Sequence, residues 1–86
     1  MPRISEFYGI VISMFWSDHP APHFHAWYSG DVAGVDLRTG AILWGSLPAR
    51  AQRLIREWAE LHRLELEVNW ERARATQPLL PIEPLP

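Results

Sequence analysis

HFHAWYSGDVAGVDLR, residues 23–38, carries the clearest strand–turn–strand pattern of the chain. Aromatic and β-branched residues favour strands on both sides, and Ser29-Gly30-Asp31 between them is typical of a tight turn. Strands joined by short turns usually pair with each other in antiparallel fashion. Gly34 weakens the second strand or marks a bulge. The stretch therefore predicts the centre of an antiparallel meander.

The residues on either side extend this meander. EFYGIVISMFWS, residues 6–17, is apolar on both alternating sets, which indicates a central strand covered on both faces. Pro20 and Pro22 fix their own φ, so the connection to the next strand is expected to be rigid. Thr39-Gly40 predicts a turn into a further short strand over residues 41–45. We expect three to four strands in all.

Residues 48–75 have helical spacing, and Pro48 fits the first turn of a helix. A straight helix of this length would span about 40 Å, which is too long for so small a domain. The apolar stripe also changes face, so we expect two helices with a break at residues 63–65. The first stripe contains Ala51, Leu54, Ile55, Trp58, Leu61 and His62, and the second contains Leu66, Trp70 and Ala73.

The last residues, TQPLLPIEPLP, contain four prolines and cannot be helical. We expect them to lie extended on the surface or against a partner. The sequence thus predicts an α+β fold, in which the meander packs on two C-terminal helices. The single domain covers residues 1–77, and an extended Pro-rich tail covers residues 78–86.

Composition excludes several classes of protein. The 86 residues include no cysteine, so disulfides and thiolate metal sites are ruled out. The net charge of −2 is far from the basic balance of a protein that binds nucleic acid through its overall field. No apolar run is long enough to cross a membrane, and we expect a soluble, cytoplasmic protein. A chain this short has marginal stability unless a metal or a partner adds to it.

The histidines are the strongest candidates for chemistry. His23 and His25 share one face of their strand with Trp27, since side chains alternate. Two imidazoles so placed can bind one zinc-like divalent transition metal if further ligands come from elsewhere. The candidates for those ligands are Asp18, His19, Asp36 and His62. Two alternatives stay open: histidines that only hydrogen-bond to the backbone, and acid–base use of one of them.

Arginines on the first helix offer a different kind of surface. Arg50 and Arg53 begin a basic edge that continues along the helix. Glu57 and Glu60 interleave with these arginines at i, i+4 spacing, which is typical of a solvated, salt-bridged face. Nucleic-acid binding through Arg50 and Arg53 is the alternative.

Four segments together resemble the small bacterial family known as domain of unknown function 4160. They are MPRISEFYGIVISMFW, DHPAPHFHAWY, GSLPARAQRLIREWAELH and NWERARATQPLLPIEPL, and they cover nearly the whole chain. The histidine signature of the family matches Asp18, His19, His23, Phe24, His25 and His62, and its helical signature matches Trp58, Asn69 and Trp70. The resemblance implies a stand-alone protein, often encoded beside a member of a second small family, domain of unknown function 2442, as in a toxin–antitoxin pair.

The chain departs from the family pattern at two positions. Trp27 stands where a glutamate is common, and Ala21 replaces a proline. Loss of an acid beside the histidines weakens a catalytic carboxylate there and makes this face more apolar. The change favours a contact surface.

These observations support three hypotheses. The first is a protein-binding component of a toxin–antitoxin-like pair, with a partner similar to family 2442 and with homo-oligomers also considered. Its candidate contact residues are Trp27, Tyr28, Leu79, Leu80 and Ile82. The second is a metal-dependent hydrolase or nuclease using His23 and His25 with one further ligand. The third is a nucleic-acid-binding regulator that uses Arg50 and Arg53.

Overall fold

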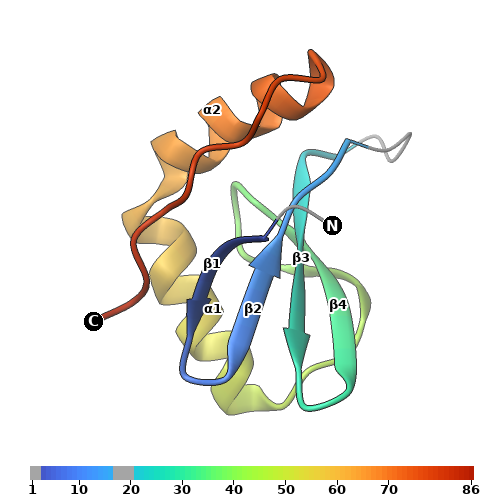
Figure 1. Ribbon diagram of the computed structural model, residues 1–86. Coiled ribbons are helices and arrows are strands. Elements are labelled where there is room, and N and C mark those ends of the chain that lie inside the picture. The colour runs from blue at the N-terminus through green and yellow to red at the C-terminus, as the bar shows by residue number, and fades with distance from the viewer. Residues whose placement is uncertain (1–2, 17–20) are drawn as a thin grey trace.

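The computed structural model of the chain describes residues 3–16 and 21–86 and has an α+β architecture (Figure 1). In the described residues, five strands form one antiparallel sheet in the order β1-β2-β3-β4-β5, so the expected number of three to four is wrong. The elements are β1 Arg3–Phe7, β2 Ile10–Ser13, β3 His23–Tyr28, β4 Asp31–Asp36, β5 Ile42–Gly45, α1 Ala49–Leu61 and α2 Arg63–Arg74. Within the described residues, no helix has the length and apolar character needed to cross a membrane.

The extra strand comes from a hairpin inside residues 6–17. Phe7 pairs with Ile10, and the two residues between them, Tyr8 and Gly9, have φ angles of 49° and 80°. Two consecutive positive φ values are typical of a type I′ turn, which usually contains Asn-Gly or Asp-Gly. Tyrosine rarely adopts this conformation. The continuous apolar pattern therefore concealed the turn.

The core lies between one face of the sheet and α1. The side chains that this inner face buries belong to Ile10, Ile12, Phe24, Ala26, Ala33 and Val35. On α1, Ala51, Ile55, Trp58 and Ala59 are buried. The ring centroid of Trp58 lies 5.3 Å from that of Phe7 and 5.7 Å from that of Phe24. The first apolar stripe of the sequence thus supplies the helical side of the core.

The helical segment breaks at His62, one residue before the expected range, and His62 has φ −117° and ψ 27°. Leu61 was expected on the buried stripe, but 64% of it is exposed. At 100° per residue, Leu61 points about 120° away from the centre of the face formed by Ala51, Ile55 and Ala59. The expectation for Leu61 was wrong because the stripe is narrower than the pattern suggested.

The C-terminal tail packs on the rest of the chain. It runs back along α2 toward β1, as the red segment of Figure 1 shows. The Ile82 N–H donates to the Ile4 carbonyl at 2.8 Å, and the Trp58 Nε1–H donates to the Glu83 carbonyl at 2.9 Å. The Asn69 side chain exchanges two hydrogen bonds of 2.8 Å with the Leu80 backbone. Since Ile82 is only 5% exposed, its side chain is part of the core.

Replacing Ile82 by alanine should test how much the tail contributes to stability. Loss of a buried isoleucine side chain is expected to lower the free energy of unfolding by about 2–4 kcal/mol, measured by urea denaturation. Glu83→Ala is the matched control, because it removes an exposed side chain and keeps the carbonyl that accepts from Trp58. The control should change stability by less than about 0.5 kcal/mol. Equal stabilities for I82A and E83A would show that the tail does not contribute to the core.

Candidate functional site

The strand histidines lie on the outer face of the sheet, opposite the face that α1 covers. In the β2–β3–β4 register, His25 pairs with Ser13 on one side and with Gly34 on the other. Phe24, the residue between the two histidines, points to Trp58 in the core. The ring centroids of His23 and His25 are 5.2 Å apart. The alternation of the strand therefore brings the two imidazoles together, as expected.

His23 has a structural position at the start of β3. Only 2% of the residue is exposed, and its Nδ1 donates to the Ala21 carbonyl at 2.9 Å. Its ring lies 5.3 Å from the ring of Trp70 on α2. Because an N–H that donates to a carbonyl cannot also serve as a metal ligand, this nitrogen is committed to the turn. His23 thus links the sheet to α2.

His25 is enclosed by aromatic rings. It stacks on Phe15 with a centroid separation of 4.4 Å and an interplanar angle of 9°, and Trp44 lies 5.2 Å away. The residue is 6% exposed, and its buried Nδ1 has no hydrogen-bond partner among the described residues. Burial, with a smaller contribution from His23, lowers the pKa of His25 below 6.5. The imidazole is therefore held neutral.

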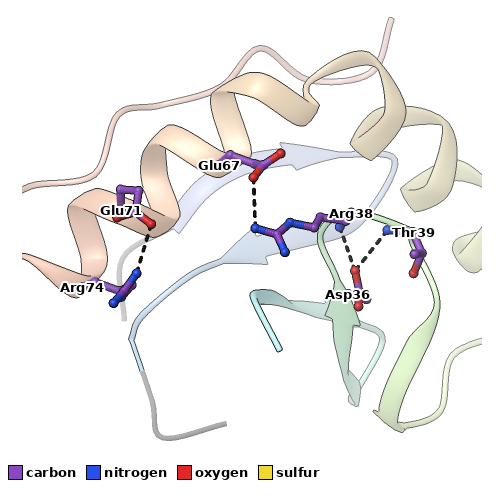
Figure 2. A network of polar contacts seen from close by, with 6 residues as sticks. All are labelled: Asp36, Arg38, Thr39, Glu67, Glu71 and Arg74. Carbon is purple, nitrogen blue, oxygen red and sulfur yellow. Dashed lines mark hydrogen bonds and ion pairs between the residues drawn. The ribbon is translucent and has the colours of Figure 1, made fainter. Parts of the chain in front are cut away.

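Of the other candidate ligands in the described part of the chain, Asp36 lies opposite His23 in the β3–β4 register, but no cluster of three ligands forms. His62 lies against Trp58, and its Nδ1 is 2.6 Å from Oε1 of Glu65. Asp36 accepts hydrogen bonds from the backbone N–H groups of Arg38 and Thr39 at 2.8 and 3.1 Å (Figure 2). Over residues 3–16 and 21–86, no three or more histidine, cysteine, aspartate or glutamate side chains come close enough to hold a metal ion. Asp18 and His19 lie outside the described residues.

Arg38 connects the turn after β4 to α2. Figure 2 shows its guanidinium reaching Glu67 on α2, with an Nη2 to Oε1 distance of 3.3 Å. Asp36 fixes the backbone of this turn, and Arg38 ties the turn to the helix. Asp36 is thus a turn-capping residue, and the side chains of Arg38 and Glu67 are exposed enough that their ion pair contributes little to stability.

Trp27 and Trp44 extend the aromatic surface around His25. Trp27 Nε1 donates to Ser13 Oγ at 3.0 Å. Trp44 lies over Gly34, so close that a Cβ atom at position 34 would be 2.2 Å from Trp44 Nε1. We call Phe15, His25, Trp27 and Trp44 together the aromatic face. Phe15, Trp27 and Trp44 remain 36%, 36% and 39% exposed.

Sequence reasoning missed two members of this face. The sequence pattern places Phe15 on a strand covered on both faces, and it indicates only a short strand around Trp44. The signal that could have identified Trp44 was Gly34, since a glycine within a strand often marks the close approach of another group. The β4–β5 register shifts between Gly34 and Val35, which is a β-bulge or a similar irregularity at this glycine.

The predicted contact residues fall on different parts of the molecule. Trp27 lies on the aromatic face, whereas Tyr28 points to the inner face and is half-buried against the core. In the tail, Leu79 is half-buried, Leu80 is 47% exposed and Ile82 is buried. Only Trp27 and Leu80 of these five therefore offer substantial apolar surface.

Arg50 and Arg53 lie exposed on α1. Arg53 lines a groove with Glu57 and Glu60, so acidic groups accompany the basic edge, as the spacing predicted. This mixture reduces the attraction of the helix for phosphate groups.

The fold and this surface define a small α+β domain with a five-stranded meander that has one face packed on a helix and an aromatic opposite face. Residues 9–71 match the family described as Domain of unknown function (DUF4160), and the chain belongs to that family. The match includes β2 to β5, α1 and most of α2. No curated protein and no solved structure matches the chain.

The buried neutral His25 predicts a pH dependence of stability. Because its pKa is lowered in the folded state, the unfolded chain binds the proton more readily, and stability is lost as the pH falls below about 6.5 toward the folded pKa. His25→Phe should reduce this acid-induced loss, measured as the difference in urea-derived unfolding free energy between pH 7 and pH 5. The same dependence in wild type and variant would contradict the assignment.

Proposed function

We propose that this protein is a protein-binding module of toxin–antitoxin type whose aromatic face engages a small protein partner. The resemblance described above suggests a partner similar to domain of unknown function 2442, encoded nearby. The observation that carries the proposal is the aromatic face itself, with three partly exposed rings on the side of the sheet opposite α1. Contiguous exposed aromatic surface is a common mark of protein interfaces.

The rings of the aromatic face are held in place before any partner arrives. Trp27 is fixed by its hydrogen bond to Ser13, and Phe15 is stacked on buried His25. The Trp44 ring packs directly over Gly34, which has no side chain. Rigid aromatic side chains lose little conformational entropy on binding, so their apolar area contributes efficiently to affinity. In this proposal the histidine pair supports the contact surface.

A groove beside Trp27 supplies a receiving site for one side chain of the partner. It has a volume of about 240 Å³ and is lined by Arg3, Val11, Ser13 and Trp27. The charge at its rim is largely balanced, because the Arg3 guanidinium lies 3.4 Å from Glu6. Such a groove suits an apolar or aromatic anchor better than a phosphate.

Substitution of Trp27 tests the proposal. Trp27→Ser should weaken binding to the protein encoded beside this one by about tenfold or more, measured by isothermal titration calorimetry. Leu61→Ser removes an exposed apolar side chain of α1 that lies outside the aromatic face, so this control should leave the affinity unchanged. Absence of binding by the wild type, or equal affinity for W27S and wild type, would refute the proposal.

The metal-dependent hydrolase remains a separate prediction. It requires Asp18 or His19 to join His23 and His25, since the described residues supply no third ligand there. Our proposal predicts that elemental analysis of protein purified without a histidine tag finds far less than one metal ion per chain. Stoichiometric metal that is lost in His25→Phe would favour the hydrolase instead.

A further inference from the structure

A second exposed apolar surface lies on α2, away from the aromatic face. Leu64 is 80% exposed and Val68 is 50% exposed, and they lie one helical turn apart. Leu80 of the tail is 47% exposed, and the three side chains border a groove of about 270 Å³ between α2 and the tail. We call Leu64, Val68 and Leu80 the α2 stripe.

The α2 stripe adjoins a hollow of a shape that fits a side chain from another helix. Val68, Glu71, Arg72 and Ala75 line this hollow together with Leu64. These four positions have the spacing i, i+3, i+4, i+7, which is the arrangement that receives a knob in helix–helix packing. Leu64 is the most exposed apolar side chain of the helix and would serve as the knob.

Opposite charges border the α2 stripe, and a two-fold axis between two copies of the chain would bring them face to face. Glu65 and Arg72 are seven residues apart, so they lie within about 20° of each other around the helix and about 10.5 Å apart along it. Along the axis of α2, Val68 lies between Glu65 and Arg72. If two α2 helices pack antiparallel with their centres at Val68, Glu65 of each copy faces Arg72 of the other.

We propose that the α2 stripe is a homodimer interface, in which two copies of this chain pack α2 against α2 in antiparallel orientation. The arrangement places Leu64 of each copy in the hollow at Val68, Arg72 and Ala75 of the other. Arg72 already donates from Nε to the Pro78 carbonyl, which positions its guanidinium. Its terminal amino groups can then meet Glu65 of the second copy. A closed two-fold contact of this kind uses the same patch on both copies.

Analytical ultracentrifugation of the full chain measures the proposed dimer. Val68→Glu should weaken dimerisation by about tenfold or more, because it places a charge at the centre of the contact. Circular dichroism should show an unchanged fold, since the side chain is exposed. Trp27→Ser, on the aromatic face, is the matched control and should leave the dimer intact.

A charge exchange tests the antiparallel orientation. Glu65→Arg and Arg72→Glu should each weaken the dimer, whereas the double variant should restore it, because opposite charges again face each other. The bond from Arg72 to Pro78 is lost in both the single R72E and the double variant, so restoration reports on the contact alone.

Three results would overturn the inference. The first is a wild-type chain that stays monomeric up to about 1 mM. The second is a dimer that V68E leaves intact or that W27S abolishes. The third is a V68E variant that loses binding to the neighbouring protein instead of self-association, which would assign the α2 stripe to that partner.

Discussion

The indole of Trp58 joins three parts of the molecule that are distant in sequence. Its ring packs against Phe7 of β1 and Phe24 of β3, and its N–H donates to Glu83 in the tail. The residue is completely buried, so the donor would be costly to bury without this acceptor. The tail must therefore return to the core, and α1 must cross the inner face of the sheet at the height of Phe24. Both requirements follow from one side chain.

The arrangement around Trp58 also determines what happens on the other side of the sheet. Since α1 occupies the inner face, the alternation of β3 turns His23, His25 and Trp27 outward. His23 is then covered by Trp70 of α2, and His25 by Phe15 and Trp44. Rings cover both imidazoles, so these histidines are polar residues inside an aromatic layer. This placement explains why His23 and His25 belong to a packed surface.

The two exposed apolar surfaces lie on different elements. The aromatic face belongs to the sheet, and the α2 stripe belongs to the second helix and the tail. The tail contributes Leu80 to the α2 stripe, where Asn69 binds its backbone, and then enters the core, where the Trp58 N–H donates to the Glu83 carbonyl. In the proposed assembly a dimer formed through α2 would present two aromatic faces to two partners, which raises the effective affinity for a linked or dimeric partner.

The local pattern of the sequence determined several features of this protein. Turn residues and β-branched runs specified the meander, helical spacing specified two helices, and the period of two placed His23 and His25 together. The local pattern did not predict the turn at Tyr8-Gly9, because strand pairing imposes the left-handed backbone of Tyr8 and no local signal marks it.

Only the tertiary structure decided the surroundings of each candidate residue. The packing of Ile82 on the core, the rings around His25 and the position of Trp44 over Gly34 all depend on segments brought together from far apart. Periodicity describes which way a side chain points from its own element. What that side chain meets is set by the packing of other elements, because burial and hydrogen bonding are satisfied over the whole fold.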